Sequence, residues 1–543
     1  MSRYERRRNR SSHRQQQKLQ QSGRSALPWI VGFAALVVLL FVFVPPWLSQ
    51  RAAIRNVLVV TMDSTGADAL ACYGGPGAQT PNLDRIARQG VRFACCTTVT
   101  PVTLPSHCSI FTSTWPLVHG VRRDWGAKLG DVAETLAEVL GRAGFQTSAI
   151  VGSAVLRQIS GLDQGFAAYT AVQTSNDAHA ATAGRPAKEV TDRAIDSLRG
   201  MSRQPFFLWA NYHDPCLATF SLEAGTATAP AGPDLAQAYA AAIRTMDAEI
   251  GRLVQALDSL QIGSRTLVVI TGAHGEDLAT HGEKGHGCFL YESTLRVPLI
   301  LRCPGKILKN RVVEDRVQTI DLMPTILDCL GQLAAPAAQG RSLRPLIPKA
   351  TTGEPPAAFA ETDVPSEVFG LASLRSLTAG QWKYIDSPDP ELYNLAQDPG
   401  ETKNLAAERP DEVTAMRKRL AAAVNTATRT LAGGDRRITP SAEDLELLSS
   451  ITYIGKSGGP ATGSDRGSTE RTKAPRAHVE AIGRYADAWR LVANGRYAEA
   501  EAPLRAVLAD LPEAPYPLRD LKLVLEKMDG ARGAVPQGAA GAR

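Results

Sequence analysis

Short apolar runs alternate with amphipathic helical stretches from about residue 52 to residue 305. Runs with so little polar alternation are typical of strands in a parallel sheet that is covered on both faces. The clearest intervening stretch is helical, because Ile243, Met246 and Ile250 recur at helical spacing. The alternation predicts an α/β fold with a large, mostly parallel open sheet flanked by helices. The expected strands cover 56–62, 147–152, 205–210, 266–271 and 297–302.

Polar side chains follow three of these predicted strands at the point where each strand ends. Asp63 follows the first strand, His213 and Asp214 follow the strand at 205–210, and His274 follows the strand at 266–271. In open α/β sheets, ligands bind beyond the carboxyl ends of the strands. We therefore expect these residues to lie together, although they are far apart along the chain.

The stretch VVITGAHGEDLATHGEKGHG, residues 268–287, contains three of the nine histidines of the chain. His274, His281 and His286 alternate there with acidic residues, which is typical of a metal site. The residue before the first histidine, where a carboxylate would complete such a site, is Ala273. The stretch alone therefore leaves open whether the metal site is intact.

The positive charge of the chain is concentrated at its N-terminus. The net charge is +6, but residues 1–25 contain eight Lys or Arg and one acidic residue, Glu5, which leaves the remainder near neutral. This distribution gives no reason to expect a nucleic-acid partner. A composition of 44% hydrophobic and 21% charged residues is that of a globular protein with a sizeable core. Most of the eight dispersed cysteines are expected to be small buried hydrophobes, and their pairing cannot be deduced from sequence.

The run ALPWIVGFAALVVLLFVFVPPWL, residues 26–48, contains no charged residue. About 20 apolar residues suffice to cross a bilayer, whereas the apolar core of a cleaved signal peptide is usually about 7–15 residues long. The run therefore favours an uncleaved transmembrane signal anchor over a cleaved signal. Because Lys and Arg remain on the cytoplasmic side, residues 1–25 are expected to be cytoplasmic. The expected localisation is a single-pass membrane protein with its main domain periplasmic or extracellular.

The remaining boundaries follow changes in composition. The main domain is expected to cover 52–425, with a small C-terminal α+β subdomain at about 355–425 that is rich in turn signals. Residues 426–476 are predicted to be a linker, because they contain a stretch rich in Gly, Ser and Thr. Residues 477–530 are predicted to be helical and resemble a tetratricopeptide unit. A lone unit of this kind either packs on the main domain or binds a protein partner.

Several motifs occur in one order and resemble the sulfatase family of the alkaline phosphatase superfamily. They include NVLVVTMDSTGADALACYGG, TPVTLPSHCSIFTSTWPLVHGV, GAHGEDLATHGEKGHG, LRVPLILRCPG and ELYNLAQDPGETKNL. The resemblance implies an alkaline phosphatase-like fold. With the N-terminal apolar run and the C-terminal helices, the whole arrangement is similar to membrane-anchored bacterial sulfatase-like proteins with a tetratricopeptide-like tail.

The resemblance also implies a divalent metal, calcium in sulfatases and zinc, magnesium or manganese in the phosphatase relatives. By position, Asp63, Asp214 and His274 match or adjoin the metal ligands. His286 matches the residue that contacts the sulfate or phosphate. His281 matches a family position whose role the sequence does not reveal.

The family's nucleophile position is occupied by Thr103. Sulfatases oxidise a Cys or Ser there to formylglycine, which threonine cannot form, and the Arg of that motif is His107 here. Phosphodiesterase relatives use threonine directly, which favours a phosphoric ester or phosphoryl transfer. The alternative for Thr103 is a hydroxyl that caps the next helix.

The chain departs from the family pattern at several site positions. Gly66 stands where the family has Arg, Asn211 and Cys216 stand where it has His, and Ala273 stands where it has the metal-binding Asp. Two hypotheses follow. The first is a sulfatase-like hydrolase with a degenerate metal site, acting on an anionic ester such as a sulfated or phosphorylated glycan or lipid headgroup. The second is a catalytically inactive sulfatase-like binding or scaffold protein.

Overall fold

The computed structural model describes most of the chain after residue 52. The described residues are 53–75, 77–124, 126–172, 184–216, 234–332, 337–348, 356–428, 473–493 and 495–533.

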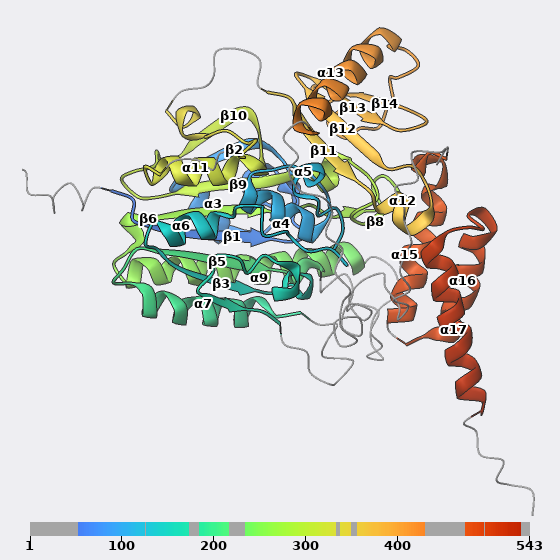
Figure 1. Ribbon diagram of the computed structural model, residues 1–543, viewed down its shortest axis with the longest axis horizontal. Coiled ribbons are helices and arrows are strands. Elements are labelled where there is room, and N and C mark those ends of the chain that lie inside the picture. The colour runs from blue at the N-terminus through green and yellow to red at the C-terminus, as the bar shows by residue number, and fades with distance from the viewer. Residues whose placement is uncertain are drawn as a thin grey trace, which may run out of the picture. The chain divides into compact units, whose positions relative to one another are not determined.

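An eight-stranded sheet forms the centre of the main domain (Figure 1). Every strand runs parallel to the others except β9, which is antiparallel to both of its neighbours. In spatial order the strands are β10 (Arg311–Gln318), β2 (Val91–Thr97), β9 (Arg296–Arg302), β6 (Thr266–Gly272), β1 (Asn56–Met62), β5 (Phe206–Tyr212), β3 (Gln146–Val151) and β4 (Ala168–Thr170).

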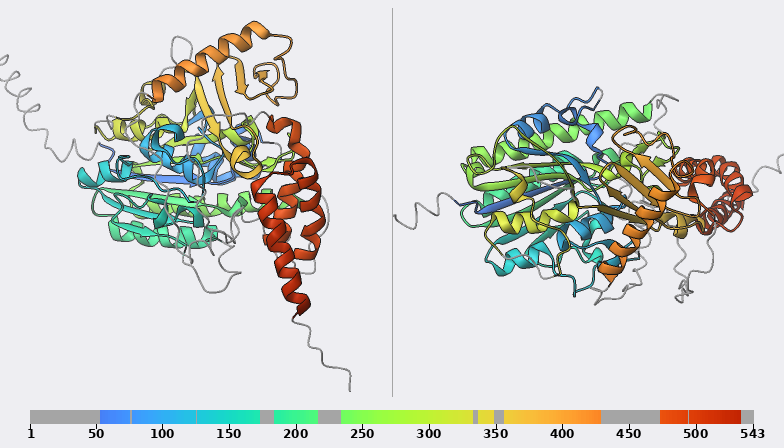
Figure 2. Two further views of the ribbon diagram at one scale, coloured as in Figure 1. Left: turned by 45° about the vertical axis from the view of Figure 1, so that its right-hand side comes forward. Right: turned by 90° about the horizontal axis from the view of Figure 1, so that it is seen from above.

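Helices cover both faces of this sheet (Figure 2). Alternate side chains of β1 pack in the cores on the two faces of the sheet, because successive side chains of a strand point to opposite sides. Val57 and Val59 belong to a core with α4, α6 and α11, whereas Leu58 and Val60 belong to a core with α3, α7 and α9. These helices are α3 (Pro81–Arg88), α4 (Thr103–Thr112), α6 (Leu136–Arg142), α7 (Ala187–Met201), α9 (Asp234–Ser259) and α11 (Leu322–Cys329).

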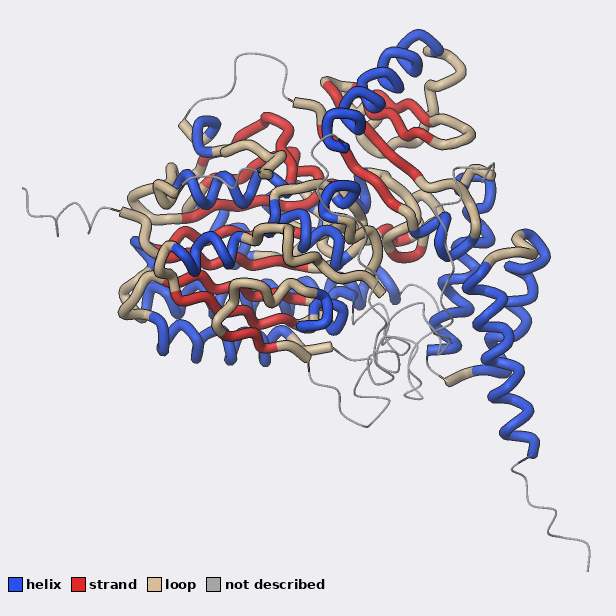
Figure 3. Tube along the Cα trace, viewed as in Figure 1, coloured by secondary structure: helices blue, strands red, loops and turns tan. Residues whose placement is uncertain are grey.

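A four-stranded antiparallel sheet follows the main sheet (Figure 3). It consists of β11 (Ala358–Thr362), β12 (Leu374–Ala379), β13 (Trp382–Asp386) and β14 (Glu391–Asn394), and α13 (Pro410–Thr428) packs on it. Three helices end the described chain: α15 (Val479–Ala493), α16 (Tyr497–Asp510) and α17 (Pro515–Gly533). Their apolar side chains share a core with residues 288–291 and with α12 (Val364–Phe369). The remaining short elements are α5 (Pro116–His119), α10 (Glu292–Leu295), β7 (Asp277–Leu278) and β8 (Lys284–Gly285).

The predicted fold class is confirmed, with all five expected strands within two residues of their predicted ends. β2, β4 and β10 are strands that the apolar pattern did not indicate. α13 extends to Thr428, two residues past the expected start of the linker at 426, and the linker residues 429–472 lie outside the described residues.

The expected membrane localisation is corrected by the structure. Among the described residues, no helix is long and apolar enough to cross a membrane. The basic segment 1–25 and the apolar run 26–48, on which that expectation depended, lie outside the described residues.

Candidate active site

Three strand ends are tied together at the carboxyl edge of the main sheet. The backbone N–H of Asp63 donates to the carbonyl of Tyr212 at 2.9 Å, and that of Ala273 donates to Met62 at 2.9 Å. The N–H of Thr65 donates to the carbonyl of His274 at 2.7 Å. Hydrogen bonds across the ends of β1, β5 and β6 therefore hold the polar residues that follow these strands in one place.

Helix α4 brings Thr103 to the same edge. Ser106, in the first turn of α4, donates its hydroxyl to the carbonyl of Ala273 at 2.6 Å, which fixes the helix to the end of β6. The N–H of Leu104 donates to a carboxylate oxygen of Asp124 at 2.7 Å. Asp124 thus satisfies a backbone donor of the first turn, which has no partner within the helix. Burial raises the pKa of Asp124 to about 6.

The hydroxyl of Thr103 contacts a histidine. Thr103 Oγ1 lies 3.0 Å from Nε2 of His274, and Nδ1 of His274 lies 2.9 Å from the carbonyl of Gly275. A carbonyl only accepts, so Nδ1 carries the proton and Nε2 accepts from the threonine hydroxyl. Burial, together with the charge of His286, lowers the pKa of His274 to about 3. His274 is therefore a neutral acceptor for the Thr103 hydroxyl.

The helix-capping alternative for Thr103 is wrong. Thr103 is the first residue of α4, and the capping position before it belongs to Val102. Thr103 is 3% exposed, and its hydroxyl contacts His274 rather than a backbone N–H of the helix.

His107 supports α4 from within. Its Nδ1 lies 2.8 Å from the carbonyl of Thr103, so Nδ1 is protonated, and its Nε2 lies 2.9 Å from the hydroxyl of Thr61. Burial lowers the pKa of His107, which keeps the ring neutral. Nε2 is 3.7 Å from Oδ1 of Asp63. The structure places His107 beside the site, with both ring nitrogens engaged in holding the backbone and Thr61.

Asp63 forms a buried ion pair with His213. The carboxylate Oδ2 accepts from Nδ1 of His213 at 3.0 Å, and Asp63 is fully buried. Burial would raise the pKa of Asp63, but the hydrogen bond from His213 and the nearby His107 lower it to about 2. Burial would lower the pKa of His213, but the Cys216 thiol and the Asp63 carboxylate hold it well above its ordinary value. Asp63 is thus ionised and His213 protonated at neutral pH.

A second ion pair lies beside His274. Nδ1 of His286 donates to Oε2 of Glu276 at 2.7 Å, and the rings of His286 and His274 are 4.1 Å apart between centroids. Burial would lower the pKa of His286, but the Glu276 carboxylate raises it to about 9. The site therefore presents two protonated imidazoles, His213 and His286, and a neutral one, His274.

The donor set does not fit calcium at the family's metal position. Calcium takes 6–8 oxygen ligands. Among the described residues, the carboxylate at that position is Asp63, which is paired with His213 and faces His107. Ala273 supplies no side-chain ligand and is completely buried. A different trio of His274, Glu276 and His286 places one ligand atom from each residue within 4.8 Å of the others. Two imidazoles and a carboxylate form a ligand set typical of zinc rather than calcium.

Asp214 and His281 lie outside this trio. Asp214 accepts from the backbone N–H of Ala187 at 2.8 Å, at the start of α7. Asp214, a predicted metal ligand, therefore lies at the N-terminus of a helix. A carboxylate there accepts from a backbone N–H that has no partner within the helix and interacts favourably with the helix dipole. His281 donates from Nδ1 to Asp277 at 3.1 Å and from Nε2 to the carbonyl of Gly400 at 3.0 Å, which makes it a structural link to the C-terminal subdomain.

Sequence reasoning missed the roles of Glu276 and Glu283. Glu276 follows His274 by two residues and could have been found as the carboxylate nearest to a predicted ligand. Glu283 is 3% exposed and accepts from the backbone N–H groups of Cys288 at 2.7 Å and Phe289 at 3.3 Å. These bonds close the chain around His286, so that residue depends on Glu283 for its place.

Glu283→Gln is expected to remove a pH dependence of folding stability. Burial raises the pKa of Glu283 from 4.5 to about 8, so the folded state binds a proton that the unfolded state has lost in this window. Stability from this group is complete below pH 4.5 and falls as pH rises to about 8, by at most about 1.4 kcal/mol per pH unit. In urea unfolding, the free energy of unfolding of the variant, relative to that of the wild type, should increase as the pH is raised from 4.5 to 8. Parallel curves would contradict the prediction.

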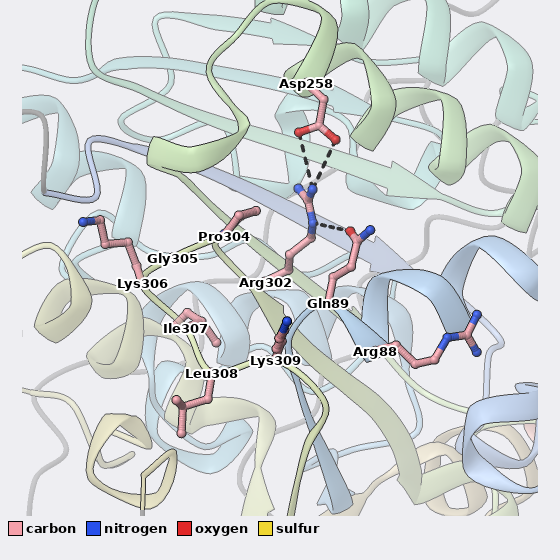
Figure 4. A pocket seen from close by; sticks show the side chains of 10 residues that line it. All are labelled: Arg88, Gln89, Asp258, Arg302, Pro304, Gly305, Lys306, Ile307, Leu308 and Lys309. Atoms are coloured by element: carbon pink, nitrogen blue, oxygen red, sulfur yellow. Dashed lines mark hydrogen bonds and ion pairs between the residues drawn. The ribbon is translucent and has the colours of Figure 1, made fainter.

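The opposite edge of the main sheet contains a surface pocket of about 780 Å³ (Figure 4). Arg302, at the end of β9, donates to Gln89 at 2.8 Å and to Asp258 at 3.2 Å, and both of these partners also line the pocket. β9 is antiparallel to β6, with Arg302 opposite Val268 near the start of β6. The pocket thus lies at the amino ends of the parallel strands and is separate from the Thr103 site.

Comparison with known proteins identifies the family. The sulfatase family model matches residues 55–332, and a model described as N-sulphoglucosamine sulphohydrolase, C-terminal, matches residues 282–429. Arylsulfatase K of Mus musculus is 34% identical over 196 residues, which cover 34% of this chain and 35% of that protein. Human (Homo sapiens) arylsulfatase A is 25% identical over 447 residues, covering 67% of this chain and 86% of that protein.

Two solved structures share the fold. The phosphonate monoester hydrolase of Agrobacterium radiobacter is 22% identical with a TM-score of 0.58, covering 71% of this chain and 100% of its own. A protein solved in complex with its substrate D-glucosamine-2-N,6-O-disulfate is 20% identical with a TM-score of 0.58, covering 69% of this chain and 98% of its own. The sulfatase model matches more than half of the 543 residues, and the chain belongs to the sulfatase family.

Proposed function

We propose that the protein hydrolyses a sulfuric or phosphoric ester, with Thr103 as the nucleophile. The observation that carries the proposal is the 3.0 Å contact between the Thr103 hydroxyl and the unprotonated Nε2 of His274. A hydroxyl is a weak nucleophile until an adjacent group takes its proton. His274 is placed to accept that proton, and it is held in the correct tautomer by Gly275.

Two positive charges near this pair suit an anionic substrate. His213 and His286 are both protonated at neutral pH, as judged from their raised pKa values. Both imidazolium groups would attract the oxygens of a sulfate or phosphate. This attraction would increase as negative charge develops on the ester in the transition state. Family relatives act on related esters: one solved neighbour binds a sulfated glucosamine and another is a phosphonate monoester hydrolase. The proposed substrate class is therefore a sulfated or phosphorylated glycan or a similar anionic ester.

With His286 deprotonated, His274, Glu276 and His286 would hold a divalent ion of the zinc class, in place of the hydrogen bonds from His286 to Glu276 and from Thr103 to His274. Bound there, such an ion would supply positive charge to the oxygens of the ester. Without the ion, the chain's own contribution is to orient the Thr103 hydroxyl through His274 and to keep Glu276 against His286. Threonine at the nucleophile position makes formylglycine chemistry inapplicable, in contrast with the usual sulfatase route.

The proposal is tested by turnover of aryl sulfate, aryl phosphate monoester, aryl phosphate diester and phenylphosphonate esters. The full-length protein is assayed with calcium, zinc, manganese or magnesium added one at a time. Release of the aryl alcohol that is lost in Thr103→Ala supports the proposal. Absence of turnover with every ester and metal, in protein that binds inorganic sulfate, would contradict it and favour the binding-protein alternative.

The alternative, a catalytically inactive sulfatase-like binding protein, is favoured by one specific feature. Ala273 occupies the metal aspartate position and is completely buried. The low pKa of His274, about 3, also makes it a weak base. In this alternative the protonated His213 and His286 bind an anionic group without cleaving it.

Ala273→Asp is expected to increase calcium affinity by about tenfold or more, because even outer contacts of a metal site change affinity 10- to 100-fold. The new carboxylate would stand beside Asp63, next to the carbonyl that Ser106 holds. Isothermal titration and elemental analysis of the purified protein measure the gain. Ala273→Asn is the matched control, since it adds similar volume without charge. Equal calcium binding by wild type, Asp and Asn variants would contradict the assignment of this position.

A further inference from the structure

Three glycines surround His286 and make its backbone intrinsically loose. We call residues 279–291 the His286 loop. Gly282, Gly285 and Gly287 have φ values of +85°, +135° and +112°, conformations that side-chain-bearing residues rarely adopt. Glycine loses more conformational entropy on folding than other residues. The strand β8 of the loop pairs with β7, which directly precedes the loop, and a hairpin of two-residue strands is marginally stable by itself.

Side chains from outside the loop hold a backbone carbonyl at or directly before each of these glycines. Arg476 donates from Nη1 to the carbonyl of His281 at 2.6 Å, and Arg490 donates from Nη2 to the carbonyl of Lys284 at 3.1 Å. Thr362, at the end of β11, donates to the carbonyl of Gly287 at 2.5 Å. Two of these three donors belong to the C-terminal helical segment that begins at residue 473. Charged donors make hydrogen bonds about twice as strong as neutral ones.

Helix α15 makes further contacts with the same loop. Asp487 accepts from Nζ of Lys284 at 2.5 Å. Val479, the first residue of α15, packs on Gly282 so closely that a Cβ there would lie 2.7 Å from a Val479 methyl group. Two helical turns on, α15 shares an apolar core with the end of the loop, from Cys288 to Tyr291. Figure 1 shows α15 and β8 near one another, in agreement with these contacts.

We propose that Arg476 and Arg490 are positioning residues of the active site: they fix the His286 loop so that the His286 imidazole stays against His274 and Glu276. Neither arginine contacts substrate or the reacting atoms. They act through the carbonyls of His281 and Lys284, which lie five and two residues before His286. In this arrangement the C-terminal helices complete the site rather than being an independent appendage.

The geometry explains why the contacts matter for His286 in particular. Its imidazole is held to Glu276 by one 2.7 Å bond and lies tilted against the His274 ring, with 4.1 Å between the centroids, so both contacts depend on the position of the backbone. On its other side, Glu283 closes the loop onto Cys288. Loss of the arginine contacts would remove the donors beside Gly282 and Gly285, while Thr362 would still hold Gly287.

The test compares full-length wild type with Arg476→Met, Arg490→Met and the double variant, which keep side-chain length and lose the donors. Arg484→Met is the matched control, because Arg484 lies on the solvent face of the same helix and pairs with Glu480. Hydrogen exchange is measured peptide by peptide. The expected result is exchange at least about tenfold faster in the His286 loop of the donor variants. Exchange in β1 and β6, and in the control variant, should be unchanged.

Inorganic sulfate binding and ester turnover provide the second readout, since turnover alone depends on the proposed function. Sulfate affinity and kcat/KM are both expected to fall about 10- to 100-fold in the double variant and to stay constant in Arg484→Met. Unchanged loop exchange in the double variant overturns the proposal. Faster exchange with unchanged sulfate affinity also overturns it, because the loop would then not position His286.

These readouts separate the two proposals. A wild type without turnover would defeat the proposed hydrolysis, while loop exchange and sulfate affinity would still decide the role of the arginines. If amide hydrogens exchange faster throughout the double variant, that variant is globally destabilised. The Asp487→Asn variant is then measured instead of the double variant. That change weakens the pairs of Asp487 with Lys284 and with Arg490, and no change in loop exchange or sulfate affinity there would overturn the proposal.

Discussion

Thr103→Ala is expected to abolish ester turnover, with kcat reduced by about 10³-fold or more. Removing a nucleophile typically costs several orders of magnitude, because the remaining site binds substrate without a group to attack it. The substitution removes the hydroxyl 3.0 Å from His274 and leaves His213 and His286 in place. Inorganic sulfate should therefore bind within about threefold of the wild-type affinity. Continuous aryl ester assays and isothermal titration measure the two effects.

Two variants control this prediction. Thr103→Ser keeps a hydroxyl and should retain measurable turnover, whereas Thr245→Ala removes an exposed hydroxyl on α9 and should have no effect. A Thr103→Ala protein that still turns over at more than about a tenth of the wild-type rate would show that another group attacks. Loss of both turnover and sulfate binding would instead indicate that the hydroxyl holds the site together.

Lys383→Met is expected to lower the free energy of unfolding by about 3–5 kcal/mol, because it breaks a buried charge network from one side. Lys383, on β13, is completely buried and donates to Glu401 at 2.7 Å and to Glu292 of α10 at 3.1 Å. Burial would raise the pKa of Glu292, but Lys383 lowers it to about 2, so this carboxylate is ionised at neutral pH. Without Lys383, Glu292 keeps a longer pair with Arg316 at 3.7 Å and Glu401 keeps the backbone N–H of Glu292, so the two neighbouring acids lose their shared cation.

The measurement is urea unfolding of the full-length protein at pH 7. Lys403→Met is the matched control, because Lys403 is exposed and its pair with Glu408 contributes about 0–1 kcal/mol. The difference between the variants should narrow in acid, where protonation of the carboxylates removes the uncompensated charge. A Lys383→Met protein as stable as the Lys403→Met control would show that the two acids are neutral in the folded state.

The sheet could be predicted because its strands are apolar over their whole length. β1, β5 and β6 are completely buried, so nothing but their flanking residues interrupts the hydrophobic run. β10 could not be predicted in this way, because three consecutive charged residues, 314–316, interrupt it and only half of its side chains are buried. Its place at the edge of the sheet follows from pairing with β2, a contact more than 200 residues away in sequence.

The site was partly predictable because several of its residues directly follow these apolar strands. Asp63, Thr103, His274 and His286 converge as the strand ends and family motifs indicated, and His213 joins them through Asp63. Asp214 could not be assigned from sequence, because its partner is the N–H of Ala187 at the start of a different helix. The protonation states were also hidden, since those of His274 and His286 depend on burial and on Glu276.

The arginine contacts to the His286 loop had no sequence signal. Arg476 and Arg490 look like ordinary charges of a surface helix, and the residues that they hold offer only backbone carbonyls. Such a contact leaves no pattern of complementary side chains. Only the fold reveals that a segment some 200 residues after His286 adjoins it.

The thiol of Cys288 can report on opening of the His286 loop. Cys288 is a free thiol, 6% exposed, whose N–H is bonded to Glu283. Burial raises its pKa well above the ordinary value, so in the closed loop it is both shielded and protonated. Alkylating reagents attack the thiolate, and Cys288 can react only during excursions that bring it to solvent. The rate of Cys288 alkylation, followed by mass spectrometry, therefore measures how often the loop opens in the native protein. A bound anion that stabilises the closed loop should slow the alkylation of Cys288.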